Sequence, residues 1–328
     1  MKISKGKSSK HASDLILKSV QILKSGGLVA FPTETVYGLG ADALNEFAVS
    51  RIYLSKGRPT SHPLIVHISS ANKILNWSKK IPDYAYELAN KFWPGPMTLI
   101  LPRTNIAKNF ITGGQNSVGI RVPNHDIAQA LLTNFESIGG LGVAAPSANR
   151  FGAVSPTTAE SVKSDLGKHL SETDLILDGG QCAIGLESTI IDCTSKLPTI
   201  LRPGAITYDM ISEVTKVNFN SIISSNKTRT SGVFKSHYAP KAKVILNSLP
   251  SEGEGLIALK NIPTPKGVIR LMSPKNIEEF AKGLYLALRS GDEQNISKIA
   301  ILIPEGTGLN EAIKDRLIKA AGLVSKEI

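Results

Sequence analysis

Short apolar runs recur along the first two thirds of the chain, and stretches of helical character lie between several of them. A short apolar run bounded by turn residues is typical of a buried strand, whereas apolar residues three and four positions apart are typical of a helix. The apolar runs are Leu28–Phe31, Leu64–Ile68, Thr98–Leu101, Val118–Val122, Gly142–Ala145, Leu175–Leu177 and Thr189–Ile191. The helical stretches lie near Ala41–Leu54, Asp83–Lys91, Ala128–Ser137 and Thr158–Asp165. The alternation predicts a sheet covered by helices, in the α/β or α+β class.

The pattern changes after Gly204. Residues 218–232 are polar and lack a periodic apolar face, which is typical of a linker. Beyond Pro240 a second alternation begins, with predicted strands Val244–Leu246, Val268–Leu271 and Ile299–Ile303 and predicted helices Asn276–Arg289 and Leu309–Ala321. A single core rarely grows past about 250–300 residues, so the length of 328 residues also favours two domains. We predict a basic N-terminal arm (1–12), a first domain (13–215), a linker (216–242) and a smaller α/β domain (243–328).

The charge balance indicates the kind of ligand. Lys and Arg number 38 against 27 Asp and Glu, a net charge of +11. Such an excess favours phosphate-bearing partners, either nucleotides or nucleic acid, although a generally basic proteome remains an alternative. Cys182 and Cys193 match no metal or redox spacing, so we predict buried thiols in a reducing compartment and no protein-held metal.

The N-terminus predicts a cytoplasmic protein. Its lysines are followed by no apolar stretch of the kind that a secretory signal needs, and an amphipathic helix is expected from Ser13 to the Gly26-Gly27 pair. No window approaches the roughly 20 apolar residues of a membrane span, so no membrane partner is predicted.

The common nucleotide-binding motifs are absent. The sequence has no GxxxxGK[ST] motif, and Gly38-Leu39-Gly40 lacks the third glycine of a dinucleotide fingerprint. It also has no HExxH, GxSxG or CxxC motif. A nucleotide would therefore be bound without a phosphate-binding loop of the usual kind.

Polar side chains instead follow the predicted strands. Thr33, Glu34, Thr35 and Tyr37 come directly after the strand that ends at Phe31. Ligand sites of α/β sheets lie at strand ends and in the loops after them. The alternative is a turn that caps the next helix.

Two basic residues and a histidine come next. Lys56 and Arg58 are two residues apart and precede Pro59. They would point the same way and grip one phosphate chain if the segment is extended, but a solvated basic turn is the alternative. His67 ends a predicted buried strand, where it is either a ligand group or a core histidine.

Arg121 lies inside the apolar strand Val118–Val122. An unpaired charge there would be costly, so Arg121 must meet an anion, either an internal carboxylate or that of a ligand. Ser147 and Asn149 follow the next apolar run, and Arg202 adds one more cation near the end of the first domain.

Eight segments together are more specific than any one of them. They occur in the order FPTETVYGLG, KGRP with PLIVH, VGIRVP, APSAN, SPT, ESTIID, LRPGA and HYAPKA. From about Asp14 onward the chain resembles the YrdC/Sua family, the L-threonylcarbamoyl-AMP synthases. The tail GTGLNEAIKDRLIKAA is similar to that of the family's long form. The resemblance implies a YrdC-like twisted open mixed sheet with helices, a linker acting as a lid that carries HYAP, and a smaller C-terminal Sua-type α/β (Rossmann-like) domain.

The resemblance also implies an activity. The family joins L-threonine, bicarbonate and ATP, with Mg²⁺, into threonylcarbamoyl-AMP and pyrophosphate. A threonylcarbamoyl transferase complex then takes the product and modifies tRNA, and a direct contact with tRNA is an open expectation.

Site residues follow by matching the family's motifs. The expected L-threonine ligands are Thr35, His67, Arg121, Ala145 and Ser188. The expected ATP ligands are Lys56, Arg58, His62, Ser117, Ser147, Asn149, Ser155, Arg202 and Tyr238. The expected catalytic residues are Lys56, Arg58, Ser147 and Asn149. Cations suit a reaction that builds negative charge on phosphoryl oxygens, and no side chain is expected to act as a covalent nucleophile.

Two alternatives remain. One is a non-catalytic basic RNA-binding protein of the YrdC type, although aromatic residues make up only 5% of the chain, few for base stacking. The other is a carbamoyl-adenylate enzyme. Such enzymes add zinc-finger or metal-rich domains, and the two unmatched cysteines argue against that architecture.

Overall fold

The computed structural model describes residues 3–5, 9–217 and 238–323. Its first domain is built on one mixed sheet, which has ten strands in the described residues, in the order β1-β8-β2-β3-β7-β4-β6-β5-β9-β10. The strands are β1 (Ile3–Lys5), β2 (Val29–Phe31), β3 (Gly38–Asp42), β4 (Ile65–His67), β5 (Met97–Pro102), β6 (Ser117–Arg121), β7 (Val143–Ala144), β8 (Leu175–Asp178), β9 (Thr189–Asp192) and β10 (Thr199–Arg202). The helices are α1 (Ser9–Lys24), α2 (Glu46–Lys56), α3 (Ile74–Trp77), α4 (Asp83–Phe92), α5 (Asn109–Thr112), α6 (Asp126–Ser137), α7 (Ala159–Leu166) and α8 (Tyr208–Thr215).

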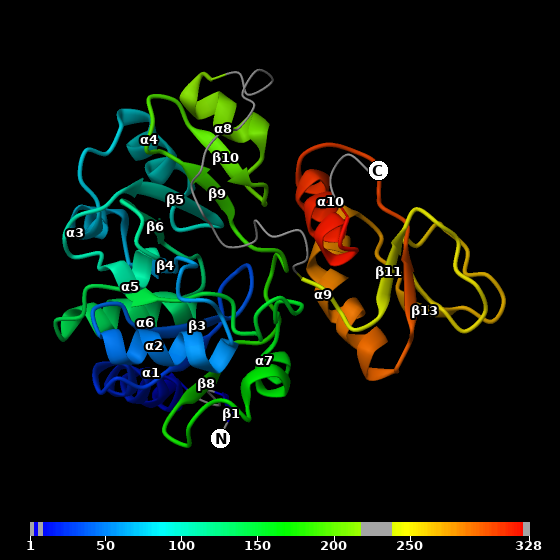
Figure 1. Ribbon diagram of the computed structural model, residues 1–328, viewed down its shortest axis with the longest axis horizontal. Helices are drawn as coiled ribbons and strands as arrows, with labels where there is room; N and C mark the ends of the chain where they lie inside the picture. The colour runs from blue at the N-terminus through cyan, green and yellow to red at the C-terminus, as the bar shows by residue number, and fades with distance from the viewer. Residues whose placement is uncertain (1–2, 6–8, 218–237, 324–328) are drawn as a thin grey trace.

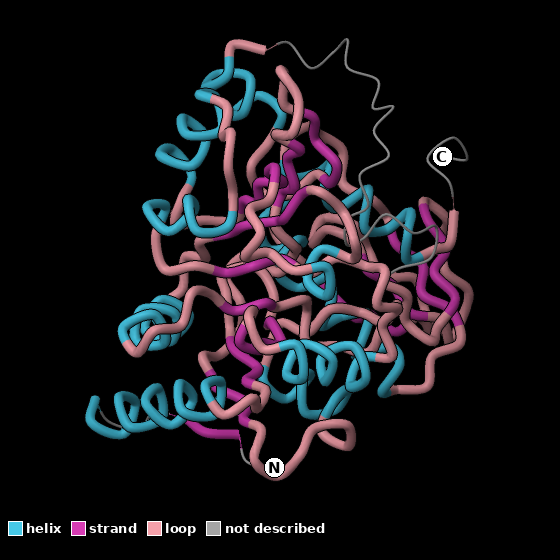
Figure 2. Tube along the Cα trace, turned by 60° about the vertical axis from the view of Figure 1, so that its left-hand side comes forward, coloured by secondary structure: helices cyan, strands magenta, loops and turns pink. Residues whose placement is uncertain are grey.

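Helices cover both faces of this sheet (Figures 1 and 2). The side chains of a strand alternate between the two faces. Val29 and Phe31 accordingly pack with α1 and α6, while Ala30 packs on the opposite face with α2, α4 and α7. The predicted mixed α/β sheet is confirmed.

The sheet brings predicted ligand residues to one edge. Strands β4 and β6 are parallel, and His67 lies opposite Arg121 in their register. Both residues end their strands, so both side chains reach the same edge. Strand β7 runs antiparallel to β4 beside them, so its continuation runs the other way and brings Ala145 beside Ile65, at the start of β4.

The second domain is a four-stranded parallel sheet in the order β11-β14-β12-β13. Its elements are β11 (Lys243–Leu246), β12 (Gly255–Ile257), β13 (Ile269–Met272), α9 (Ile277–Glu293), β14 (Lys298–Ile301) and α10 (Leu309–Ala320). Helices α9 and α10 pack on one face of this sheet and lie between it and the first domain (Figure 1). The other face carries a small apolar cluster to which residues 258–268 contribute. The predicted α/β domain is confirmed, with α9 and α10 on the same face.

Apolar residues of the first domain belong to the second domain's core. Val36, Val154 and Leu186 pack in one cluster with residues of α9, α10, β11, β12 and β14. The two domains therefore share buried surface.

Some elements differ from the predicted ones. Helix α1 begins at Ser9, before the predicted Ser13 cap, and Ile3–Lys5 pairs with β8, so the predicted arm contains regular structure. The predicted helix Ala41–Leu54 is the end of strand β3 followed by α2, because Asn45 accepts the Ala48 N–H and caps α2 there. Strands β3, β10 and β12 and helices α3, α5 and α8 were not predicted.

Most of the predicted linker and lid, residues 218–237, lies outside the described residues. No described helix is both long and apolar enough to cross a membrane.

Candidate active site

A cavity lies where loops and strand ends of the first domain meet Tyr238. Segments from eight parts of the chain contribute to its wall, which contains three arginines and one glutamate. The lining residues are Thr33, Val36, Tyr37, Gly38, Arg58, Ile65, His67, Arg121, Ala145, Pro146, Ser147, Glu187, Ser188, Arg202 and Tyr238. Such a wall suits an anionic ligand.

Arg58 and Arg202 are buried cations close to one another. Arg58 donates to the Pro63 carbonyl (2.9 Å) and lies over the ring of Phe151. Burial lowers the pKa of Arg58 to about 10, and the positive charge of Arg202 contributes to the shift. Burial also lowers the pKa of Arg202. Two buried like charges are stabilised when an anion joins them.

Arg121 has an internal partner. Its Nη2 lies 2.8 Å from the Glu34 carboxylate and donates to the Thr35 hydroxyl at 2.9 Å. The sequence left open whether Arg121 meets an internal carboxylate or the carboxylate of a ligand, and the structure shows an internal one, Glu34. The Nε–H of Arg121 has no acceptor among the described residues, although the side chain also lines the cavity. A ligand carboxylate can therefore approach the same guanidinium.

His67 is a buried, neutral imidazole. Burial, with the nearby charge of Arg121, lowers its pKa to about 3. Its ring meets Phe31 edge-on, and Nδ1 has no hydrogen-bond partner among the described residues. His67 thus offers an unused nitrogen in the wall of the cavity.

Lys56 supports the loop after β7. Its ammonium donates to the carbonyls of Ser147 (2.6 Å) and Asn149 (2.5 Å) and lies 3.4 Å from the Asn149 amide oxygen. Burial lowers its pKa well below the usual value. The segment is not extended, because Gly57 ends α2 in the left-handed region (φ 62°), so Lys56 and Arg58 do not point the same way. Of the two, only Arg58 lines the cavity, and the phosphate contact of Lys56 stays a prediction.

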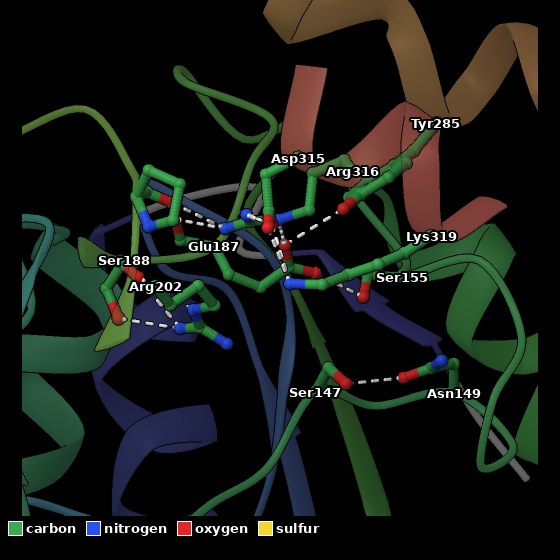
Figure 3. Close-up of polar contacts among 11 residues, drawn as sticks. Ser147, Asn149, Ser155, Glu187, Ser188, Arg202, Tyr285, Asp315, Arg316 and Lys319 are labelled. Atoms are coloured by element: carbon green, nitrogen blue, oxygen red, sulfur yellow. Dashed lines mark hydrogen bonds and ion pairs between the residues drawn. The ribbon is translucent and has the colours of Figure 1, made fainter. Parts of the chain in front are cut away.

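Glu187 is the one carboxylate in the lining (Figure 3). It accepts from the hydroxyls of Ser155 (2.5 Å) and Tyr285 (2.9 Å) and from Nε of Arg316 (2.8 Å). Burial would raise its pKa, but the charges of Arg316 and Arg202 outweigh burial, and its pKa falls to about 2. Glu187 is therefore ionised at neutral pH.

Ser188 and Arg202 are held together beside Glu187. Nε and Nη2 of Arg202 donate to the Ser188 carbonyl at 3.0 and 2.9 Å, and Nη2 lies 3.1 Å from the Ser188 hydroxyl (Figure 3). That hydroxyl also contacts Thr98. A predicted threonine ligand and a predicted ATP ligand are thus neighbours.

Tyr238 closes the cavity from the second domain's side. It is buried, adopts a left-handed backbone (φ 61°) and stacks on Tyr285, with the Arg316 guanidinium over its ring. The positive charge of Arg202 acts on its hydroxyl. Tyr238 is in place at the cavity, whereas most of the segment before it lies outside the described residues.

The structure gathers most, but not all, of the predicted ligands. Eight of them line the cavity: Arg58, His67, Arg121, Ala145, Ser147, Ser188, Arg202 and Tyr238. Four others contact a lining residue: Thr35 on Arg121, Lys56 and Asn149 on Ser147, and Ser155 on Glu187. His62 packs against Phe151, on which Arg58 also lies. Ser117 begins β6 and so lies at the opposite end of that strand from Arg121.

The sequence prediction missed Glu187, Tyr285 and Arg316. Glu187 stood in the ESTIID motif without an assigned role. Tyr285 and Arg316 lie on helices whose apolar spacing predicts only packing, so no local signal marks them.

The described residues contain no group of three or more His, Cys, Asp or Glu side chains that could hold a metal ion. The cavity lining offers one carboxylate, Glu187, which is already engaged by Arg316, and one neutral imidazole, His67, among cationic and hydroxyl groups. It fits a metal only if the ligand supplies oxygen ligands of its own.

The fold and the cavity define a two-domain α/β protein with a cationic site at the strand ends of its first domain. Two family models match this chain. The Sua5/YciO/YrdC model, described as telomere recombination, covers residues 21–204. The second, described as the C-terminal domain of threonylcarbamoyl-AMP synthase, covers residues 206–322. The chain belongs to the Sua5/YciO/YrdC family, which confirms the resemblance found in the motifs.

Similar proteins share both domains. The chain is 40% identical over 319 residues to threonylcarbamoyl-AMP synthase of Pyrococcus abyssi, covering 92% of each chain. It is 38% identical over 328 residues to threonylcarbamoyl-AMP synthase of Bacillus subtilis, covering 94% of this chain and 93% of that one. The crystal structure of P. abyssi Sua5 complexed with L-threonine matches with a TM-score of 0.84 and 36% identity, over 98% of this chain and 96% of that one.

Proposed function

We propose that this chain is an L-threonylcarbamoyl-AMP synthase, a nucleotidyltransferase that makes threonylcarbamoyl-AMP and pyrophosphate from L-threonine, bicarbonate and ATP. The observation that carries the proposal is the cavity itself. It places a carboxylate-binding group, Arg121, in the same wall as the cations Arg58 and Arg202, which suit a triphosphate. The names of the similar proteins support the same reaction.

The threonine end of the cavity is formed by Arg121, His67 and Ala145. Arg121 binds the amino acid's carboxylate through N–H groups that Glu34 and Thr35 do not use. The imidazole of His67 is neutral, so it orients a polar group without repelling the amine. The backbone of Ala145 and the hydroxyl of Ser188 complete this end.

The nucleotide end is formed by Arg58, Arg202, Ser147 and Tyr238. The two guanidiniums stabilise the charge that develops on the α-phosphoryl group and on the leaving pyrophosphate. Lys56 acts indirectly, because its ammonium donates to the Ser147 carbonyl and so holds the loop that contains Ser147. ATP brings Mg²⁺ on its own phosphate oxygens, since the protein offers the ion no ligand cluster among its described residues. The ion supplies further charge stabilisation when it is bound.

The reaction has two steps. The neutral amine of threonine attacks bicarbonate, a C–N bond forms, and water leaves to give a carbamate. A carbamate oxygen then attacks the α-phosphorus in line, and the bond to the β-phosphate oxygen breaks as pyrophosphate leaves. The protein acts by positioning the carbamate and ATP and by excluding water, because carbamates decompose in water.

The product has a consumer in this proposal. A threonylcarbamoyl transferase complex takes the adenylate and modifies tRNA in the cytoplasm, where ATP and tRNA meet. Direct contact of the basic chain with tRNA is part of the proposal only as a means of delivering the product.

The test measures pyrophosphate release from MgATP by the full chain. Release that requires both L-threonine and bicarbonate, with a product mass equal to threonylcarbamoyl-AMP, is expected. No release, together with salt-sensitive binding of tRNA, would favour the non-catalytic RNA-binding protein instead. Release driven by carbamoyl phosphate without threonine would favour the carbamoyl-adenylate enzyme.

A further inference from the structure

Arg316 of α10 reaches from the second domain into the first. It is fully buried, and its Nε donates to the Glu187 carboxylate at 2.8 Å (Figure 3). Its Nη2 donates to the Pro203 carbonyl at 3.0 Å, directly after Arg202 in the chain. One side chain of the C-terminal domain thus contacts both segments that carry Ser188 and Arg202.

Glu187 is an unusual neighbour for a triphosphate. Its carboxylate is ionised, buried and part of the cavity lining. The charges of both Arg316 and Arg202 act on it. A buried carboxylate that loses its paired cation is left as an uncompensated charge. Without Arg316, the cation that still acts on Glu187 is Arg202.

Among the described residues, Arg316 is the only direct ionic partner of Glu187. Ser155 and Tyr285 are neutral donors, and Arg202 donates instead to the Ser188 carbonyl. Asp315 and Lys319 pair with each other beside the cluster, and Asp315 also contacts Arg316. Arg316 therefore balances Glu187, and Arg202 stays on the Ser188 segment.

We propose that Arg316 is a positioning residue that neutralises Glu187, so that the charge of Glu187 does not draw Arg202 away from the phosphates of the nucleotide. The C-terminal domain thereby completes the nucleotide site of the first domain. This inference rests on the proposed function for the identity of the ligand, a nucleoside triphosphate.

Arg316 could also matter only because it holds the two domains together, so a control for that structural role is needed. Arg289 of α9 provides the matched control, because it pairs with Asp165 at 2.6 Å and also donates to the Val154 carbonyl. Those contacts join the same two domains without touching Glu187. Arg289→Met weakens docking and leaves the charge of Glu187 balanced, whereas Arg316→Met removes both a docking contact and that balance.

The experiment measures, by calorimetry on the full chain, the Kd of the Mg²⁺ complex of α,β-methylene-ATP and, separately, the Kd of L-threonine. Arg316→Met should weaken nucleotide binding about tenfold or more and change threonine binding less than about twofold. The double variant Arg316→Met/Glu187→Gln should bind the nucleotide within about threefold of the wild type, and so should Arg289→Met.

Equal losses in Arg316→Met and Arg289→Met, or no recovery in the double variant, would overturn the inference. If Arg316→Met does not fold, the test compares the nucleotide affinity of Glu187→Gln with that of the double variant. Once the carboxylate is gone, loss of Arg316 should not change nucleotide affinity, and a large further loss overturns the proposal. Absence of nucleotide binding by the wild type overturns it as well. Pyrophosphate release by the wild type is measured in a separate assay. Failure of the proposed reaction is therefore distinguished from failure of the predicted nucleotide affinities of the variants.

Discussion

Single side chains mark the cavity through buried polar atoms that the described protein leaves unused. Nε of Arg121 and Nδ1 of His67 are two such atoms, and both residues lie in the cavity wall. Buried polar atoms are nearly always hydrogen-bonded, because an unsatisfied one costs about 1–3 kcal/mol. A ligand that satisfies these atoms recovers that free energy as binding affinity.

Arg121 should affect stability and threonine binding separately. Arg121→Met leaves the buried Glu34 carboxylate without its cation, so we expect the free energy of unfolding to fall by about 3–5 kcal/mol. Arg121→Met/Glu34→Gln should regain much of that stability, yet neither variant should bind threonine. Urea unfolding and calorimetry with threonine check the two effects. Undiminished threonine affinity in Arg121→Met would mean that the guanidinium serves Glu34 alone.

His67 should make stability depend on pH. Its folded pKa of about 3 lies below the ordinary 6.5, so between these values the unfolded chain binds one proton more. Stability from this residue is present above pH 6.5 and is lost as the pH falls. Between about pH 7.5 and about pH 5, the wild type should lose about 2 kcal/mol more unfolding free energy than His67→Gln. Parallel pH profiles of the two proteins in urea unfolding would contradict the neutral assignment.

At the scale of elements, the end of one helix supports the loop after a distant strand. Lys56 is the last residue of α2, and its ammonium donates hydrogen bonds to the carbonyls of Ser147 and Asn149. The Phe151 N–H donates back to the Lys56 carbonyl. The position of Ser147 in the cavity thus depends on where α2 ends.

Lys56→Met should loosen this loop before any nucleotide is added. The substitution keeps the length of the side chain but removes the donor, so two buried carbonyls lose their partner. Amide hydrogen exchange of residues 147–153 in the ligand-free protein should accelerate about tenfold or more, with weaker nucleotide binding as a consequence. Unchanged exchange with lost nucleotide binding would instead support the direct phosphate contact expected from the motifs.

At the scale of the molecule, the two domains form one packed unit. Their shared apolar cluster and the Arg316–Glu187 and Arg289–Asp165 ion pairs bridge them. Gly185 shows how closely they approach, because a Cβ on it would lie 2.6 Å from the Lys282 Cα in α9. The interface has no room there for a side chain.

Gly185→Ala should therefore separate the domains. Its methyl group meets backbone atoms of α9, which cannot move independently of the helix. We expect calorimetric unfolding to change from one transition in the wild type to two in the variant, with weaker nucleotide binding. Gly180→Ala is the matched control, since Gly180 has a similar positive φ (78°, against 83° for Gly185) but open space around its Cβ. Identical behaviour of both variants would assign the effect to backbone strain.

The sequence by itself determined most strands and most helices, and it indicated polar residues that line the cavity. Apolar spacing and strand-end polar residues are local properties, so they indicated the two α/β domains and the need of Arg121 for an anion, whereas the nucleotide role of Arg202 came from the family resemblance. The motifs then indicated the family.

Only the tertiary structure decided which charges face one another. Glu34 and Arg121 are far apart in the chain, as are Glu187 and Arg316, and periodicity carries no information about such pairs. The same holds for Lys56, whose direction depends on the left-handed turn at Gly57. Charge pairing is set by distances in space, and packing of the sheet and of the second domain sets those distances.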